Sequence, residues 1–129
     1  MKVLIVDDSA LVRRAVRLLF ETDDVFEVCG EAENGREAIE KTTALRPELV
    51  IMDLAMPVLN GFDATRAIKR IKPGVPVILF SGFSSVLEEK EAQSVGISAL
   101  VSKSNPSILV DVAHQLLRIN SSILYGPAV

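Results

Sequence analysis

Four short apolar runs with little alternation constrain the fold of this chain more than any other feature. They occupy residues 3–6, 49–52, 75–80 and 99–101. Strands that are buried on both faces show this pattern, which is typical of a parallel sheet covered by helices. A fifth segment, 25–32, places charged Glu27 and Glu31 among apolar residues, and this alternation predicts an edge strand. The sequence therefore predicts five strands.

Segments with the apolar spacing of amphipathic helices separate these strands. The first is expected to turn Arg13, Arg14 and Arg17 away from the sheet, either as a solvated face or as a docking surface for a partner. The apolar residues expected to face the sheet are, segment by segment, Leu11, Ala15, Leu18 and Leu19; Ala38, Ile39, Thr42 and Leu45; Phe62, Ala67, Ile68 and Ile71; Val86, Leu87 and Val95; and Ile108, Leu109, Val112 and Leu116.

Three polar residues mark expected helix starts. Asn34 and Ser85 each lie three residues before a glutamate, which is the spacing of a capping box. Asn105 precedes Pro106, as a capping residue precedes a proline at the first helical position. Strands and helices are therefore expected to alternate along the whole chain.

This alternation predicts one doubly wound (βα)5 α/β domain, flavodoxin-like, with a five-stranded parallel sheet in the order 2-1-3-4-5 and helices on both faces. A chain of 129 residues has the usual size of one domain. The domain is expected to span residues 1–120. The small residues of 121–129 are typical of a C-terminal tail or the start of a linker.

Composition excludes several classes of protein. The formal net charge of −3 provides no basic surface for nucleic-acid phosphates, so this domain is expected to bind no nucleic acid directly. No apolar run approaches the ~18 residues of a membrane span, so no membrane association is expected. The one cysteine, Cys29, excludes an intrachain disulfide and a cysteine-rich zinc site, favours the cytoplasm, and is expected to pack on the edge strand.

Polar side chains follow four of the predicted strands. Asp7 and Asp8 come directly after the first, Asp53 after the third, Ser81 after the fourth and Lys103 after the fifth. Each has an ordinary explanation by itself, such as a helix dipole, a turn or a solvated charge. They are expected to meet, because ligands of open parallel sheets bind at the carboxyl ends of the strands.

Three carboxylates at one edge of a sheet need positive charge near them. Two unit charges ~4 Å apart repel by about 4 kcal/mol at an effective dielectric constant near 20. Lys103 supplies one positive charge, and oxygen ligands without histidine or thiol favour Mg²⁺ for the rest, with Mn²⁺ as a substitute. A metal beside a carboxylate, an ammonium group and a hydroxyl is typical of phosphoryl transfer, in which an aspartate can be the nucleophile.

Four motifs surround these polar residues. They are, in chain order, Val6-Asp7-Asp8-Ser9, Met52-Asp53-Leu54-Ala55-Met56-Pro57 with Asn60-Gly61, Phe80-Ser81-Gly82 and Val101-Ser102-Lys103. Together they resemble the receiver (CheY-like) domain of bacterial two-component response regulators, over about residues 2–119. The resemblance implies a phosphoacceptor signalling domain of a two-component system and not a turnover enzyme.

The resemblance also implies a role for each residue. Asp53 accepts a phosphoryl group from a sensor histidine kinase or a phosphotransfer protein, and Ser81 and Lys103 each contact a phosphoryl oxygen. Pro57 and Gly61 shape the loop over the acceptor. The implied ligands of Mg²⁺ are Asp8, Asp53, the backbone carbonyl of Ala55 and, through water, Asp7.

Two positions depart from the family. Leu100 replaces the tyrosine or phenylalanine that usually lies three residues before the lysine, so an aromatic rotamer switch is not expected. Ser104 replaces the proline that often follows the lysine, and the Lys103–Ser104 bond is expected to be trans, since a cis bond without proline costs ~2.5–4 kcal/mol. The signal is expected to reach a downstream effector through the face of the fourth helix, fifth strand and fifth helix.

Three other functions share parts of this pattern. A Mg-dependent aspartyl-phosphate phosphatase or phosphotransferase on a similar fold usually has a second aspartate two residues after the nucleophile, where this chain has Ala55. A flavodoxin-like cofactor carrier binds a phosphate after the first strand, where Asp7 and Asp8 would repel it. A degenerate receiver lacks some of the chemical residues, all of which are present here. His114, with no second histidine in the chain, is expected to be solvated.

Overall fold

Five parallel strands form the central sheet of this computed structural model, which describes residues 1–82 and 86–117. The strands are β1 (Lys2–Val6), β2 (Glu27–Ala32), β3 (Leu49–Met52), β4 (Val77–Ser81) and β5 (Ala99–Ser102). The helices are α1 (Ala10–Glu21), α2 (Gly35–Leu45), α3 (Gly61–Ile71), α4 (Val86–Val95) and α5 (Leu109–Leu116), with a 3-10 turn (Pro106–Ile108) before α5. The sheet order β2-β1-β3-β4-β5 confirms the predicted flavodoxin-like α/β fold. None of the described helices is long and apolar enough to span a membrane.

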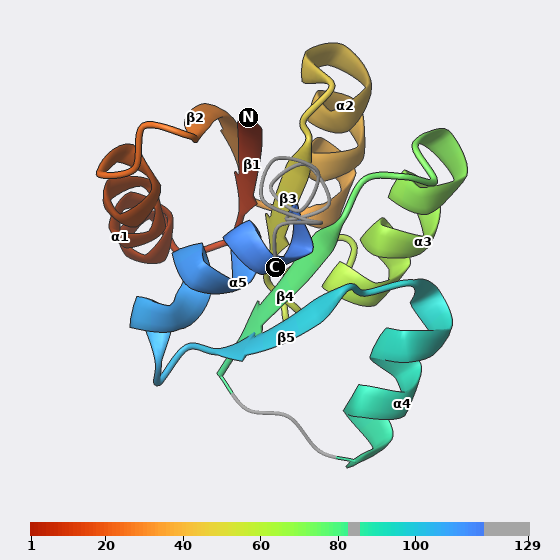
Figure 1. The fold of residues 1–129 in the computed structure, drawn as a ribbon. Helices are drawn as coiled ribbons and strands as arrows, with labels where there is room; N and C mark the ends of the chain where they lie inside the picture. Colours follow the sequence, from red (N-terminus) through yellow and green to blue (C-terminus); the bar gives the residue numbers. More distant parts are fainter. Residues whose placement is uncertain (83–85, 118–129) are drawn as a thin grey trace, which may run out of the picture.

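Helices cover both faces of the sheet, with α1 and α5 on one face and α2, α3 and α4 on the other (Figure 1). Successive residues of β1 point to opposite faces. Leu4 therefore belongs to the core under α2, α3 and α4, together with Ile68. Ile5 belongs to the core under α1 and α5, together with Phe20 and Leu109. Asp7 and Asp53, which follow β1 and β3, belong to neither hydrophobic core and are available for a site.

The last strand differs from its prediction. The runs that form β1, β3 and β4 are buried on both faces, apart from their end residues. β5 pairs with β4 alone, and Leu100 remains 39% exposed. The prediction that this run is buried on both faces is wrong, because β5 is the second edge strand of the sheet and has a neighbour on one side only.

The buried face of α1 is not the predicted one. Val16 and Phe20 are buried, whereas Leu11 is 81% exposed and Leu18 is 55% exposed. Both sets have helical spacing, but packing selects the stripe that contains the phenylalanine, whose ring buries more apolar area than a leucine. Three residues of other helices that were expected to face the sheet are also exposed: Ile71, Leu87 and Ile108.

The predicted helix starts have different outcomes. Asn34 caps α2 as predicted, because its side-chain oxygen accepts a hydrogen bond from the backbone N–H of Glu37 at 2.8 Å. The prediction for Asn105 is wrong in part: Pro106 does begin a helical turn, but the turn is 3-10 and the Asn105 side chain makes no capping bond. Ser85 lies outside the described residues.

Candidate functional site

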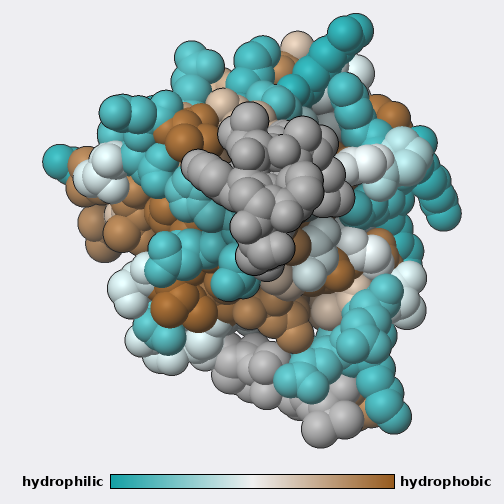
Figure 2. All heavy atoms as spheres, viewed as in Figure 1, coloured by the Kyte–Doolittle hydropathy of each residue, from teal (hydrophilic) through white to brown (hydrophobic). Residues whose placement is uncertain are grey.

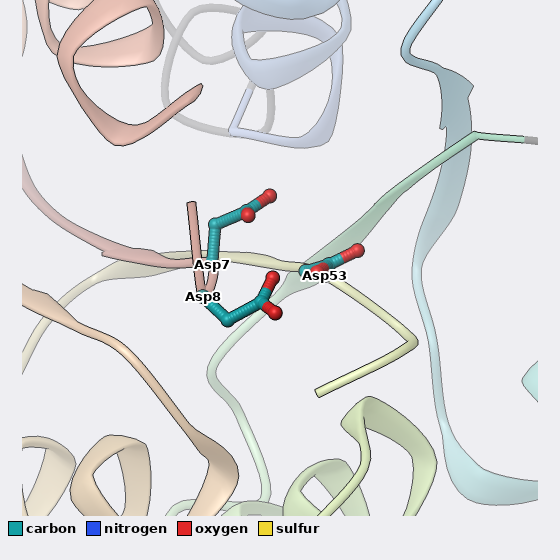
Figure 3. Close-up of side chains that lie close together, drawn as sticks. All are labelled: Asp7, Asp8 and Asp53. Atoms are coloured by element: carbon teal, nitrogen blue, oxygen red, sulfur yellow. The ribbon is translucent and has the colours of Figure 1, made fainter. Parts of the chain in front are cut away.

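Three aspartates meet where β1 and β3 end (Figure 3). The two strands are neighbours, and the backbone N–H of Asp53 donates to the carbonyl oxygen of Val6 at 2.9 Å. One carboxylate oxygen from each of Asp7, Asp8 and Asp53 lies within 4.8 Å of the others. The sheet therefore brings together three carboxylates that lie far apart in the sequence.

Asp7 is held at both of its carboxylate oxygens and is 2% exposed. Its Oδ1 accepts a hydrogen bond from the backbone N–H of Ser9 at 2.9 Å, and its Oδ2 lies 2.8 Å from Nζ of Lys103. Ser9 also begins α1, since its hydroxyl oxygen accepts from the N–H of Val12 at 3.2 Å. The turn from β1 into α1 thus fixes the Asp7 side chain and leaves Asp8 exposed.

Lys103 links the aspartates of β1 and β3. Its ammonium lies 3.1 Å from Oδ1 of Asp53, and its backbone N–H donates at 2.7 Å to the carbonyl oxygen of Ser81, the half-buried last residue of β4. Burial opposes the charge of Lys103, but its hydrogen bonds to Asp7 and Asp53 raise its pKa above the usual value. The Lys103–Ser104 peptide bond is trans, as predicted.

The crowding of charge is most evident at Asp53, which is 5% exposed. Burial, and then the charge of Asp7, raise the pKa of Asp53, while the hydrogen bond from Lys103 opposes this shift. Asp7 and Asp53 share the ammonium of Lys103, and Asp8 adds a third carboxylate beside them, so negative charge is in excess. A bound cation would offset this charge and favour the ionised form of Asp53.

The donor set fits a hard divalent cation. All three groups are carboxylates, and no histidine or thiol of the described residues belongs to the cluster. Sparse ligation by protein oxygens suits Mg²⁺, which retains several of its waters. Asp8 is exposed, so solvent reaches the cluster. Ala55, whose carbonyl is the fourth predicted ligand, lies on the exposed loop after β3.

The loop that follows β3 returns close to Asp53 at Gly61. A Cβ at this position would lie 2.1 Å from the carbonyl oxygen of Asp53, so a larger residue does not fit. The N–H of Gly61 donates to the carbonyl of Leu54 at 2.8 Å. Asn60 then caps α3 by accepting a hydrogen bond from the N–H of Asp63 at 2.9 Å. The predicted need for glycine in this loop is thus explained by close approach of the backbone.

The sequence pattern did not predict the contacts of Arg13. Its side chain is 16% exposed and donates to the backbone carbonyl of Asp7 at 2.7 Å. Its Nε lies 2.9 Å from one carboxylate oxygen of Glu31, whose other oxygen lies 2.8 Å from Nε of Arg17. The prediction that Arg13 and Arg17 form a solvated or docking face is therefore wrong in part. The only signal in the sequence was opposite charge, which does not specify geometry.

Two further side chains lie outside the acidic cluster. The prediction for His114 is right in part: its side chain is 40% exposed, but its Nε2 lies 2.7 Å from Oδ2 of Asp23 and its ring packs against Phe26 with centroids 5.0 Å apart. This hydrogen bond lowers the pKa of Asp23 and joins α5 to the segment between α1 and β2. Cys29 packs against the core from the edge strand, as predicted, and burial raises the pKa of its thiol.

The sequence matches the family described as the response regulator receiver domain over residues 3–114. Two similar curated proteins are both named protein-glutamate methylesterase/protein-glutamine glutaminase. The protein of Methanococcoides burtonii is 42% identical over 114 residues, which are 87% of this chain and 32% of that protein. The protein of Paramagnetospirillum magneticum is 46% identical over 103 residues, which are 80% of this chain and 29% of that protein. This chain thus spans about a third of the length of these relatives.

Two solved structures show the same fold. The response regulator domain of Thermotoga maritima CheB has a TM-score of 0.76 and 33% identity, over 91% of this chain and 90% of that one. A two-component response regulator of the LuxR family from Aurantimonas sp. SI85-9A1 has a TM-score of 0.84 and 30% identity, over 90% of this chain and 84% of that one. Sequence and fold thus point to the same family.

Proposed function

The chain belongs to the response regulator receiver domain family, which comprises phosphoacceptor signalling domains of two-component systems, and we propose that Asp53 is its phosphoacceptor. The contact between the Asp53 carboxylate and the ammonium of Lys103 carries this proposal. Asp7 is bound at both carboxylate oxygens, whereas hydrogen bonds from the described residues engage only Oδ1 of Asp53. Oδ2 of Asp53 is thus the oxygen proposed to attack.

In the proposed transfer, Oδ2 of Asp53 forms a bond to phosphorus while the bond between phosphorus and a histidine nitrogen of the donor breaks. The carboxyl group must be ionised to attack. Lys103 then pairs with one phosphoryl oxygen, and the hydroxyl of Ser81 donates to another. Ser81 ends β4 and Lys103 follows β5, and both lie on the same side of the acceptor, since β4 lies beside β3 and β5 beside β4. They would therefore sense whether Asp53 is phosphorylated.

Mg²⁺ is the proposed cofactor, with Mn²⁺ as a substitute. The proposed ligands are Asp8, Asp53 and the backbone carbonyl of Ala55, with Asp7 acting through a water. The ion would neutralise charge on the phosphoryl oxygens when bound. The excess of carboxylate charge supports this proposal, because without a cation the cluster would repel an incoming phosphoryl group.

The proposed donor is a sensor histidine kinase or a phosphotransfer protein. The receiver domain is itself non-enzymatic, whereas the relatives named above are about three times as long and are methylesterase/glutaminase proteins. A methylesterase effector is therefore the proposed recipient of the signal. We also propose that the receiver unit spans residues 1–120. The presence of a single cysteine favours a cytoplasmic location.

The proposed output face consists of α4, β5 and α5. The exposed Leu100 of β5 lies on a groove of about 230 Å³ that α4 also lines, through Ala92 among others. A leucine fills space but has no ring to swing between solvent and core. The signal is therefore proposed to pass by backbone movement at the end of β4, beside Ser81, into α4.

Intact mass after incubation with Mg²⁺ and acetyl phosphate tests the proposal. The wild-type chain is expected to gain one phosphoryl group, and chelation of Mg²⁺ is expected to prevent it. Asp53→Asn should gain none, while Asp63→Asn, at an exposed aspartate of α3, should label like wild type. Equal labelling of Asp53→Asn, or no labelling of wild type by acetyl phosphate or a phosphohistidine donor, would contradict the proposal.

A further inference from the structure

Arg13 reaches the acidic cluster from α1 by way of the backbone. Its Nη1 donates to the carbonyl oxygen of Asp7 at 2.7 Å, and its Nε donates to Oε1 of Glu31 at 2.9 Å. The carbonyl of Asp7 belongs to the peptide unit that joins Asp7 to Asp8. The guanidinium therefore holds the one peptide plane that lies between two carboxylates of the cluster.

This carbonyl lies between the two regular elements of the region. Pairing of β1 with both neighbours ends at Val6, and α1 begins at Ala10, so neither the sheet nor the helix provides the Asp7 carbonyl with a donor. A buried carbonyl needs a partner, and Arg13 supplies it. Rotation of this peptide would swing the carboxylate of Asp8 relative to that of Asp53.

Glu31 determines which group Arg13 can bind. Oε1 of Glu31 lies 2.9 Å from Nε of Arg13, and Glu31 belongs to β2, so this ion pair ties the guanidinium to the edge strand. A guanidinium pairs readily with carboxylates and stays charged. Without Glu31, Arg13 would be free to turn to the aspartates and compete with a cation there.

We propose that Arg13 is a positioning residue of the acidic cluster, which fixes the Asp7–Asp8 peptide so that both carboxylates face Asp53. Glu31 keeps the guanidinium of Arg13 on that peptide and away from the carboxylates. The inference rests on the proposed function, because the positioned carboxylates are the proposed ligands of Mg²⁺. Residues that orient metal ligands in this way typically change metal affinity by 10- to 100-fold when they are replaced.

The test is the Mg²⁺ affinity of the full chain, measured by titration of backbone amide chemical shifts. Arg13→Gln is expected to weaken Mg²⁺ binding by about 10-fold or more. Arg17→Gln is the matched control, since it removes an ion pair with the same Glu31 from the same helix without touching Asp7. The affinity of this control is expected to stay within about 2-fold of wild type, because no ligand is released.

A kinetic comparison separates positioning from general destabilisation. The phosphorylation rate of Arg13→Gln is expected to need about 10-fold more Mg²⁺ to reach half its maximum. At saturating Mg²⁺ its maximal rate should approach that of wild type, since Arg13 touches no reacting atom. Arg13→Lys keeps the charge but loses the fork that reaches two partners, so it should be intermediate, and it replaces Arg13→Gln if that variant does not fold.

Wild-type Mg²⁺ affinity in Arg13→Gln, or in Arg13→Lys where that variant replaces it, or an equal loss in Arg17→Gln, would overturn this inference. If wild type binds Mg²⁺ but is never phosphorylated, the proposed function fails alone, and the affinities of the variants still decide the role of Arg13. If wild type binds no Mg²⁺, both proposals fail.

Discussion

Helices α1 and α4 follow strands that end at the same edge of the sheet, and the two helices are attached to the sheet very differently. α1 buries Val16 and Phe20, and Arg13 and Arg17 on its flank are paired with Glu31 of the edge strand. α4 buries smaller side chains, at Ala92 and Val95, and carries a run of four charged residues, 88–91. Figure 2 shows mostly hydrophilic atoms over α4, and both hydrophobic and hydrophilic atoms over α1.

The difference separates the carboxylates proposed to bind the metal from the helix proposed to pass on the signal. The carboxylates of Asp7 and Asp8 lie between β1 and α1, where ion pairs and a large buried ring resist movement. Ser81 ends β4, and among the described side chains of the next helix, α4, the buried ones are Ala92 and Val95. Elements with few buried apolar contacts open at low free energy and are those that move in switches. We therefore expect α4 to move more readily than α1 when the domain is switched.

The largest expected difference between the two helices is in unfolding. Phe20→Ala should lower the free energy of unfolding by about 3–5 kcal/mol, because it empties a fully buried site under α1. Leu87→Ala in α4 should change it by less than about 0.5 kcal/mol, since Leu87 is 78% exposed. Denaturant titration measures both. Similar losses in the two variants would remove the contrast.

Hydrogen exchange tests whether α4 is the element that moves. Binding of Mg²⁺ and beryllofluoride, a phosphoryl mimic, should change amide protection by about 10-fold in 86–95 and near Lys103, and by less than about 2-fold in α1. Changes confined to α2 and α3 would show that the signal leaves by another route.

Leu100→Ala is the control for that experiment. It should leave phosphorylation of Asp53 nearly intact, because Leu100 lies on the outer part of β5 and touches no reacting group. Loss of phosphorylation in this variant would place Leu100 in the chemistry rather than in the output.

Removing the negative charge of Asp53 should raise the free energy of unfolding of the metal-free chain by about 1 kcal/mol. The pKa of Asp53 is raised on folding by burial and by Asp7, so its ionisation destabilises the folded chain at every pH above its unfolded pKa. Asp53→Asn should therefore unfold at higher denaturant than wild type when Mg²⁺ is chelated. The gain in stability of this variant over wild type should be complete at a pH above the pKa of Asp53 in the folded chain. The gain should disappear as the pH falls through that pKa. Equal midpoints at neutral pH would argue against a crowded site.

The smallest expected effect concerns the contact between His114 of α5 and Asp23, which lies between α1 and β2. The pKa of Asp23 is lowered, chiefly by its hydrogen bond with His114, so the pair contributes stability above the unfolded pKa of Asp23 and loses it as the pH falls through the folded pKa. Asp23→Asn should lower the free energy of unfolding by roughly 0.2–1 kcal/mol at neutral pH and by less in acid. Asp24→Asn, next to it and exposed, should have no such effect.

The amino-acid sequence was sufficient to predict the sheet and the position of the acidic cluster. Runs of apolar residues at 3–6 and 49–52 have no other stable place than strands covered on both faces, because each buries side chains in both directions. Once the strands are parallel, Asp7, Asp8 and Asp53 must follow their carboxyl ends. Local pattern and chain direction are sufficient for this, so tertiary detail adds little.

Three features depend on how the elements pack: which face of α1 is buried, the place of β5 at the edge of the sheet, and the partners of Arg13 and His114. Leu11 and Phe20 both lie on stripes of helical period, and the choice between the stripes depends on the volume available against the sheet. Arg13 and Glu31 are 18 residues apart, and His114 and Asp23 are 91 residues apart. The spacing of residues along the sequence does not predict such pairs, because the distance between their side chains depends on how whole elements pack.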